Sequence, residues 1–272
     1  MNQDFVVSSD GTKISYLSQG SGKPVIVVPG ALTLAEDFAP FGRELAQNFT
    51  VYILERRGRG QSGPPGDNYG IGKECEDVRA LQQKTGAEFI FGHSFGGLVA
   101  LETARHNRDF LKVAVYEPGV SIDGAIPIGW AEKCQEQLAQ GKNLDAFVTF
   151  VRGINPEISG KIPAWLLKRI LPLAIKKAEL EQKFRLLPGT IPEHREVARL
   201  DNSYPNYREI PAQILLLCGG RPKKSWAERT VTRLAQELPQ ASMHQFPKFD
   251  HFGPEKFPQA VAAEVTAFFL RK

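Results

Sequence analysis

Short apolar runs alternate with amphipathic segments over most of this sequence. The runs are rich in Val, Ile, Leu and Phe, and the β-branched run 24–28 has the pattern of a strand buried on both faces of a parallel sheet. Between the runs, apolar residues recur at helical spacing, as in segments 38–48 and 74–84. The runs predicted as strands are 5–9, 13–17, 24–28, 51–54, 87–91, 111–116, 214–218 and 242–246. This alternation predicts an α/β fold with a doubly wound, mostly parallel sheet.

The alternation stops after the strand that ends at Tyr116 and resumes near Ile214, and the segment between them is helical in pattern. The helices predicted there are 130–140, 144–151, 164–186 and 193–200. An all-helical insertion between two sheet strands is what a lid over the strand ends would look like. The expected division is therefore a core of residues 1–117 and 212–272 and a helical cap (lid) of residues 118–211.

One stretch of the predicted cap, 165–173, is unusually apolar. It is either cap core packed on the main domain or part of an apolar substrate pocket, because binding clefts tend to be apolar. Basic residues interrupt and follow the stretch, which fits a solvated face or a membrane surface. No apolar run approaches the roughly 20 residues of a membrane span, and we do not expect membrane association.

The segment Gly92-His93-Ser94-Phe95-Gly96 joins a short apolar strand to an Ala- and Leu-rich helix. This is the nucleophile-elbow pattern G-x-S-x-G in the context that it requires. The turn is so tight that Ser94 must be strained, and side chains at both glycines would collide with backbone. The N–H of Phe95 then lies in the first turn of a helix, where donors are unpaired and negative charge is favoured. The alternative is a Gly-rich turn with a helix-capping serine, which the flanking strand and helix disfavour.

A second glycine-rich stretch, Gly58 to Gly63, matches the dinucleotide pattern G-x-G-x-x-G after a strand. A dinucleotide site requires this pattern to open directly into a helix, whose N-terminus meets the phosphate. Here Pro64 and Pro65 follow, so the chain continues as a loop. The sequence therefore does not predict a nucleotide cofactor.

Composition narrows the class of protein further. The chain has 272 residues, of which 42% are hydrophobic and 24% charged, as in a globular domain. The net charge of +4 is mild and its basic residues are spread out, so we expect no nucleic-acid partner. Cys75, Cys134 and Cys218 are odd in number and far apart, which fits neither a disulfide framework nor a metal site. With an N-terminus that lacks a signal-peptide layout, they predict a cytoplasmic protein.

A serine nucleophile needs a base within hydrogen-bond reach, and histidine serves because its pKa lies near neutrality. The chain has five histidines. His251 follows the last predicted strand, at the sheet edge where ligands bind in such folds. His244 lies within that strand, His93 points away from the elbow, His106 ends the elbow helix and His194 starts a predicted cap helix. We therefore predict His251 as the base.

The order of these pieces resembles the α/β-hydrolase superfamily over almost the whole chain. The matching stretches are 27–30 (Val-Val-Pro-Gly), 56–63 (Arg-Arg-Gly-Arg-Gly-Gln-Ser-Gly), 92–97 (Gly-His-Ser-Phe-Gly-Gly) and 250–252 (Asp-His-Phe). The resemblance implies an eight-stranded sheet, a helical cap and a catalytic triad in the chain order Ser, acid, His. The mechanism that it implies requires no cofactor, and no metal cluster is visible in the sequence. The resemblance says little about the substrate, because this fold hosts many chemistries.

Two positions depart from the superfamily pattern. The superfamily usually has His-Gly where this chain has Pro29-Gly30. Its oxyanion donor is the backbone of the next residue, so the resemblance implies an oxyanion hole made by the N–H groups of Ala31 and Phe95. The usual triad acid is an Asp in the loop after the second-to-last strand, but this chain has no carboxylate there before Glu228.

Glu117 is the triad acid that we predict instead. Some superfamily members place the acid after the strand that follows the elbow helix, and Glu117 directly ends that strand. Pro118 then disfavours helix at position 117. Glu228 is a rival, although Ser225 before it indicates that it lies in the next helix, and Asp123 is a lesser rival farther into the cap. The alternative role for Glu117 is to cap N–H groups of a loop or of the cap.

These residues predict a serine hydrolase that acts on an ester or related acyl bond of a small, largely apolar molecule. Its acyl-enzyme would form on Ser94. Carboxylesterase, lipase-like, thioesterase and amidase activities are not distinguished by the sequence, and neither is the oligomeric state. The alternative is a hydrolase-fold ligand-binding or signalling protein with weak or no turnover. Ser94 and His251 favour the enzyme, whereas the missing Asp slightly favours the alternative.

Overall fold

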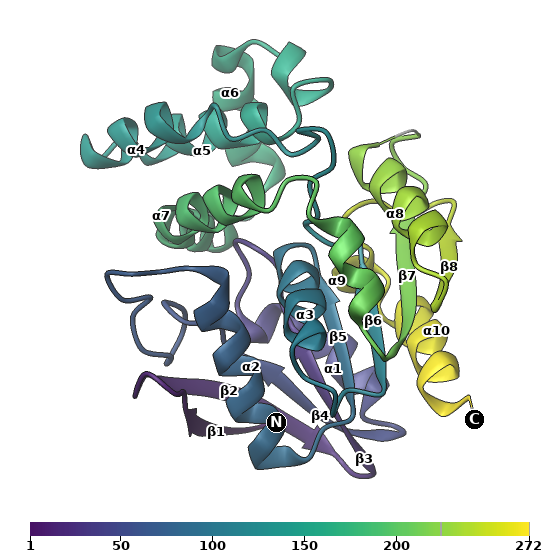
Figure 1. Cartoon of the computed structure of the whole chain (residues 1–272). Coiled ribbons are helices and arrows are strands. Elements are labelled where there is room, and N and C mark those ends of the chain that lie inside the picture. The colour runs from purple at the N-terminus through teal and green to yellow at the C-terminus, as the bar shows by residue number, and fades with distance from the viewer. Residues whose placement is uncertain (224, 272) are drawn as a thin grey trace.

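In the computed structural model, an eight-stranded sheet runs through the molecule, and helices cover both of its faces (Figure 1). The structure describes residues 1–223 and 225–271, so Lys224, in the loop after the second-to-last strand, and Lys272 lie outside it. The strands are β1 (Asn2–Val7), β2 (Lys13–Gly20), β3 (Lys23–Val28), β4 (Phe49–Leu54), β5 (Phe89–His93), β6 (Lys112–Tyr116), β7 (Gln213–Gly219) and β8 (Ala241–Phe246). Their order is β1-β2-β4-β3-β5-β6-β7-β8, antiparallel from β1 to β4 and parallel from β4 onward. This confirms the predicted doubly wound, mostly parallel α/β sheet.

Alternate side chains of each strand point to opposite faces of the sheet, and both faces are apolar. In β3, Ile26 and Val28 join one buried cluster, while Val25 and Val27 join another. The helices that cover the first face are α2 (Ile71–Thr85), α3 (Phe95–Arg105) and α8 (Trp226–Glu237). Those on the second face are α1 (Ala39–Leu45), which follows the 3-10 helix η1 (Ala35–Phe38), and α10 (Pro258–Leu270), which follows the short α9 (Gly253–Lys256). Because both faces are covered, the central strands can be apolar throughout.

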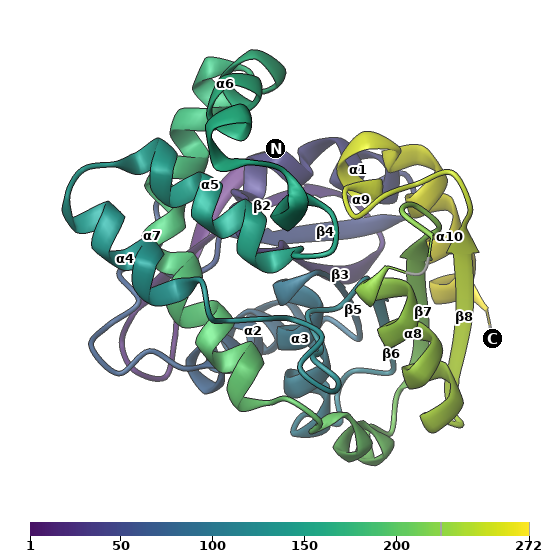
Figure 2. The ribbon, with the colours of Figure 1, turned by 90° about the horizontal axis from the view of Figure 1, so that it is seen from above.

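Between β6 and β7, where the structure describes every residue, the chain forms helices and loops and no strand. The helices there are α4 (Ala131–Ala139), α5 (Asn143–Ile154), η2 (Ser159–Lys161), α6 (Ala164–Ala174), α7 (Lys177–Arg199) and η3 (Tyr204–Glu209). We refer to α4 to α7 as the cap helices. Their buried cluster includes Trp130, Phe150 and Leu187, and Leu32 of the loop after β3 joins it. The cap helices therefore lie at the carboxyl ends of the strands, to one side of the molecule when it is seen from above (Figure 2).

The structure corrects the boundaries of two predicted cap helices. The segment predicted as one helix over 164–186 is interrupted after Ala174, where two residues have extended backbone. The helix predicted over 193–200 is not separate, because α7 continues through Pro188 and Pro192. A proline inside a helix costs about 3 kcal/mol. Burial of the apolar residues beside both prolines in the cap cluster offsets this cost.

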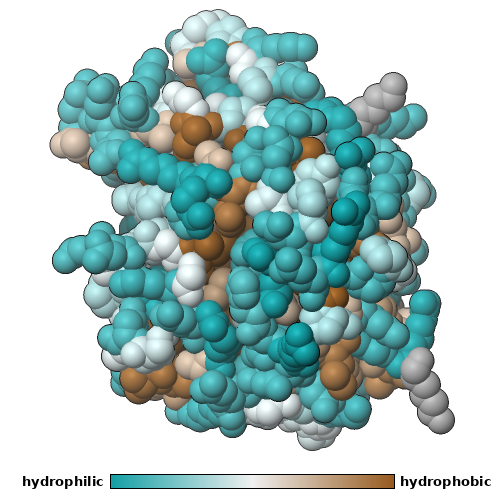
Figure 3. Space-filling view, viewed as in Figure 1, coloured by the Kyte–Doolittle hydropathy of each residue, from teal (hydrophilic) through white to brown (hydrophobic). Residues whose placement is uncertain are grey.

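The apolar stretch 165–173 lies on α6 and is only partly buried. Leu167 is buried, but 60% of Trp165 and 89% of Leu173 remain exposed. The interpretation of this stretch as cap core is therefore wrong for these two residues. Apolar surface also appears near the middle of the face in Figure 3, where the cap helices meet the core. Among the described residues, no helix is both long and apolar enough to cross a bilayer.

Very close backbone packing marks the turn from β5 into α3. Ser94 lies there with φ of 53° and ψ of −122°, a conformation that residues with side chains rarely adopt. A Cβ at Gly92 would overlap the carbonyl oxygen of Gly96, and a Cβ at Gly96 would overlap the carbonyl oxygens of Val28 and Pro29. Both positions therefore require glycine: the end of β5 lies directly against the backbone of α3 at Gly92, and the end of β3 and the loop after it lie directly against the start of α3 at Gly96.

Gly96→Ala should lower the free energy of unfolding by about 2–3 kcal/mol, because the new methyl group meets backbone that cannot move aside. Chemical denaturation followed by circular dichroism measures this change. Gly72→Ala is the matched control, because a Cβ at that position of α2 meets nothing within 4 Å. The control should be neutral or should stabilise by up to about 1 kcal/mol. A Gly96→Ala variant as stable as the wild type would contradict the packing described here.

Candidate active site

Ser94 joins β5 to α3, and its peptide groups are held from both sides. Its N–H donates to the carbonyl of Tyr116, at the end of β6, over 3.1 Å. Its own carbonyl accepts hydrogen bonds from Gly97 and Leu98 of α3 and from Gly119 beyond β6. These bonds hold the strained turn in place. They keep Ser94 at the carboxyl edge of the sheet, where ligands bind in parallel α/β folds.

His251 lies between β8 and α9, next to Ser94. The Ser94 hydroxyl lies 3.2 Å from Nε2 of His251, within hydrogen-bond distance. Two side chains hold the backbone of this loop: the Tyr116 hydroxyl donates to the carbonyl of Asp250 over 2.8 Å, and Nε2–H of His93 donates to the carbonyl of His251 over 2.8 Å. Residues at the ends of β5 and β6 therefore set the position of His251.

Glu117 follows β6 directly and is buried beside His251. Its Oε2 accepts a hydrogen bond from Nδ1–H of His251 over 2.6 Å, and its Oε1 accepts one from the N–H of Gly219 over 2.8 Å. The backbone of Glu117 is strained, with φ of 42°, and its N–H donates to the carbonyl of Leu217 over 2.8 Å. Strand β7 thus anchors both backbone and side chain of Glu117. The amide that binds the carboxylate is that of Gly219, the last residue of β7.

The rival carboxylates lie elsewhere. Glu228 is in the first turn of α8, where its N–H donates to the hydroxyl of Ser225 over 3.1 Å. Asp123 is exposed, and its N–H donates to the side-chain oxygen of Asn202. The carboxylate that accepts the hydrogen bond from His251 is that of Glu117. The same carboxylate also accepts from the N–H of Gly219, so Glu117 binds the end of strand β7 rather than N–H groups of a loop or of the cap.

Burial and charge act in opposite directions on the pKa of His251. Burial lowers this pKa, but the hydrogen bond and negative charge of Glu117 outweigh burial, and the pKa lies above its ordinary value. For His93, burial and the neighbouring ring of His251 hold the pKa well below its ordinary value. The ring of His93 is therefore neutral at pH 7 and donates from Nε2 alone.

A buried carboxyl group lies behind His93. Oε1 of Glu255 is 3.5 Å from Nδ1 of His93, and burial raises the pKa of Glu255 to about 7. Much of Glu255 is therefore protonated at neutral pH. The charge of Glu255 acts on His251 in the same direction as that of Glu117, but it raises the pKa of His251 less.

The N–H groups of Ala31 and Phe95 both belong to segments that border Ser94. Phe95 is the first residue of α3, and the loop that contains Ala31 packs against the elbow so closely that a Cβ at Gly30 would lie 3.0 Å from the Cβ of Ser94. Within the described part of the chain, neither N–H donates to a protein acceptor. Two such donors beside a serine hydroxyl can stabilise negative charge on a reacting group.

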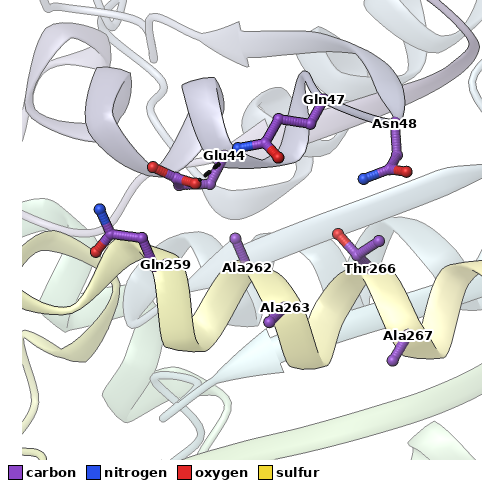
Figure 4. A pocket seen from close by; sticks show the side chains of 8 residues that line it. All are labelled: Glu44, Gln47, Asn48, Gln259, Ala262, Ala263, Thr266 and Ala267. Atoms are coloured by element: carbon purple, nitrogen blue, oxygen red, sulfur yellow. Dashed lines mark hydrogen bonds between the residues drawn. The ribbon is translucent and has the colours of Figure 1, made fainter.

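Two shallow cavities lie away from these residues. One, of about 360 Å³, is a groove between α1 and α10, lined by side chains such as Glu44 and Thr266 (Figure 4). The other, of about 300 Å³, lies on the cap helices beside Phe184. Neither is lined by the residues around Ser94. No group of three or more His, Cys, Asp or Glu side chains among residues 1–223 and 225–271 is placed to hold a metal ion.

The sequence did not predict the contacts that hold the histidine and the acid. Gly219 is the last residue of β7 and the first of a Gly-Gly pair, which is a signal of close backbone approach. A Cβ there would overlap the carbonyl oxygen of Phe249. This signal could have identified the amide that binds Glu117. No sequence pattern indicates that the ring of His93 reaches the carbonyl of His251, 158 positions later.

Comparison with known proteins assigns the chain to a family. Residues 25–264 match the Alpha/beta hydrolase family, and the chain belongs to this family. The match extends from β3 into α10, so it includes the parallel part of the sheet and the cap helices. The resemblance inferred from the sequence motifs is thereby confirmed.

Curated relatives match part of the chain. It is 32% identical to N-formylmaleamate deformylase of Pseudomonas putida over 124 residues, which cover 43% of this chain and 46% of that protein. It is also 32% identical to a non-heme haloperoxidase of Rhodococcus erythropolis over 127 residues, which cover 45% of this chain and 44% of that protein. The chain thus spans less than half the length of these curated relatives.

A solved structure matches nearly the whole chain. An alpha/beta hydrolase from Sphaerobacter thermophilus has a TM-score of 0.83 and 27% sequence identity, and the match covers 98% of this chain and 100% of that one. The arrangement of sheet, flanking helices and cap helices is therefore shared with a protein of known structure.

Glu117→Gln should lower the pKa of His251. The amide can still accept a hydrogen bond from Nδ1, but it carries no negative charge. It therefore raises the pKa of His251 less than the carboxylate does, while burial still lowers this pKa. The wild-type imidazole therefore keeps its proton to higher pH than the imidazole of the variant. NMR titration of the His251 ring measures both values. Exposed Asp123 supplies the control Asp123→Asn, which should leave the pKa of His251 unchanged, and an unchanged value in Glu117→Gln would contradict the electrostatics described.

Proposed function

We propose that this protein is a serine hydrolase that cleaves an ester or related acyl bond of a small, largely apolar molecule. The observation that carries this proposal is the chain of contacts from Ser94 Oγ to Nε2 of His251, at 3.2 Å, and from Nδ1 of His251 to Glu117, at 2.6 Å. Nucleophilic catalysis by serine requires a hydroxyl, a base and an orienting acid in this order. Membership of the Alpha/beta hydrolase family supports the same interpretation.

In the proposed mechanism, Nε2 of His251 takes the proton of Ser94 while Oγ attacks the carbonyl carbon of the substrate. The carbonyl oxygen becomes an anion and accepts hydrogen bonds from the N–H groups of Ala31 and Phe95. Glu117 stabilises the imidazolium, which then gives its proton to the leaving group. The acyl group stays on Ser94 until water, deprotonated by the same histidine, releases the acid and restores the serine.

Side chains around the triad support an apolar substrate. The ring centroids of Trp226 and Phe252 lie 5.9 and 5.7 Å from that of His251. Leu32 directly follows the proposed oxyanion donor Ala31 and belongs to the buried cluster of the cap helices. A substrate at Ser94 would therefore meet apolar groups from both core and cap, as in most small-molecule sites.

We also propose the division into a core of residues 1–117 and 212–272 and a lid of residues 118–211, supported by the absence of strands between β6 and β7. A cytoplasmic location is proposed because Cys75, Cys134 and Cys218 are free thiols, all of them buried.

Ser94→Ala should abolish labelling by a fluorophosphonate probe and hydrolysis of chromogenic esters while the fold stays intact, because only an activated serine reacts with the probe. Ser225→Ala is the control: this serine caps α8, and its loss should cost about 1 kcal/mol of stability without affecting labelling. Substantial ester hydrolysis by Ser94→Ala would overturn the proposal. A folded wild type that neither labels nor hydrolyses any ester in a chain-length series would support the ligand-binding alternative.

His251→Ala should lose about 10³-fold or more in kcat, and Glu117→Gln about 10²–10⁴-fold, because the members of a triad act as a unit. Steady-state kinetics with a p-nitrophenyl ester measures both losses, and circular dichroism checks the fold of each variant. Near-normal activity of His251→Ala would assign the base to another histidine. Near-normal activity of Glu117→Gln would leave Glu117 only its role as acceptor for Gly219.

A further inference from the structure

The carbonyl oxygen of Gly30, in the loop after β3, accepts three hydrogen bonds. Nη1 of Arg56 and Nη1 of Arg59 donate to it over 3.1 and 2.6 Å, and the hydroxyl of Thr33 donates over 2.8 Å. Both arginines are buried, with only 1% and 5% of their surface exposed. Removing two cations from water is costly. Here both guanidinium groups donate hydrogen bonds to the same backbone carbonyl.

This carbonyl belongs to the same peptide group as the N–H of Ala31, one of the two proposed oxyanion donors. A peptide group is planar, so fixing the oxygen also fixes the direction in which the N–H points. Charged donors form strong hydrogen bonds to the oxygen and polarise the group, which makes its N–H a better donor. The two arginines can thus act on the oxyanion hole without touching the substrate.

Arg56 also contacts the residue that supplies the other donor. Its guanidinium carbon lies 4.5 Å from the centroid of the Phe95 ring, within the range of a cation–π contact. One buried side chain therefore contacts both segments that carry the proposed donors: the loop after β3 and the start of α3.

Two buried carboxylates balance the two cations and hold them in place. Glu74 of α2 accepts from Nε and Nη2 of Arg56 over 3.1 and 2.8 Å. Glu193 of cap helix α7 accepts from Arg56 over 2.9 Å and also from Arg59. The arginine pair is thereby fixed from a core helix and from a cap helix, and neither guanidinium is free to turn away from Gly30.

Arg57, which lies between them in the sequence, makes different contacts. It donates to Asp77 over 2.8 and 2.6 Å and to Asp10 over 3.1 Å. Its remaining hydrogen bonds go to the carbonyls of Pro65 and Lys73. Arg57 therefore ties its own loop to α2 and to the β1–β2 turn, and it makes none of the contacts to Gly30.

We propose that Arg56 and Arg59 are positioning residues of the oxyanion hole, which they orient and polarise through the carbonyl of Gly30. This inference rests on the proposed function, because it requires an acyl substrate at Ser94. Its consequence is specific: loss of Arg59 should weaken the stabilisation of an oxygen anion more than it weakens the other steps of catalysis.

The test compares two substrates, p-nitrophenyl acetate and the thionoester in which sulfur replaces its carbonyl oxygen. Sulfur accepts hydrogen bonds poorly, so the thionoester gains little from an oxyanion hole. In Arg59→Met we expect kcat/KM for the oxygen ester to fall about tenfold, less than for loss of a hole donor itself, while kcat/KM for the thionoester changes by less than about twofold. Arg59→Lys keeps the charge, so the ratio of kcat/KM for the oxygen ester to kcat/KM for the thionoester should lie between the values of Arg59→Met and the wild type. Arg57→Lys is the matched control and should leave the ratio at the wild-type value.

The ratio of the two kcat/KM values does not depend on how much of the enzyme is folded, so a merely structural role of Arg59 would lower both activities and leave the ratio unchanged. That outcome in Arg59→Met would overturn the inference. If Arg59→Met has no measurable activity, Arg59→Lys decides in the same way, with a smaller expected fall in the ratio. Ser94→Ala, assayed alongside, separates the two proposals: activity that survives in it contradicts the proposed function, whatever the ratio shows.

Discussion

Backbone meets backbone around Ser94 more closely than side chains would allow. Gly92 faces the carbonyl of Gly96, and a Cβ at Gly97 would lie 2.9 Å from the Cα of Pro118. This steric constraint brings the loop after β3, the start of α3 and the chain after β6 to one point. Ala31 and Glu117 belong to two of these segments, so the contacts at the elbow also place the proposed oxyanion donor and the proposed acid. The strain at Ser94, of about 1–3 kcal/mol, persists because the surrounding sheet determines the conformation.

Electrostatics gives opposite pKa shifts to two histidines that are close in space. The rings of His93 and His251 have centroids 4.9 Å apart, yet the pKa of His93 is lowered and that of His251 is raised. The difference arises because the hydrogen bond and charge of Glu117 raise the pKa of His251, whereas burial and the neighbouring ring of His251 lower that of His93. Groups whose environments push their pKa values apart are a mark of acid–base sites. In the proposed mechanism the raised pKa suits a histidine that must hold a proton during the reaction.

Family membership alone does not decide the reaction. The curated relatives that match parts of this chain are named a deformylase, a non-heme haloperoxidase and a soluble epoxide hydrolase. One fold thus carries several chemistries, and the site must be argued from its own geometry. In this chain the site contains a serine at the elbow, the carboxylate of Glu117 directly after β6, and two buried arginines from the loop after β4 that donate to the carbonyl of Gly30.

Local patterns in the sequence determined the sheet and the elbow. Apolar runs predict buried strands because a strand that is covered on both faces has apolar side chains on both faces. Glu117 was predicted as the acid because it directly ends the strand after the elbow helix, a position where the superfamily resemblance allows an acid.

Contacts between distant segments were decided only in the tertiary structure. The amide of Gly219 reaches Glu117, 102 positions earlier, and Glu193 reaches Arg56 across 137 positions. Pro188 and Pro192 lie inside α7, although proline usually ends a helix. Leu173 is 89% exposed, although leucine is usually buried. The physical reason is the same in each case: propensity and periodicity act within one segment, whereas hydrogen-bond partners and burial depend on which surfaces the whole chain brings together.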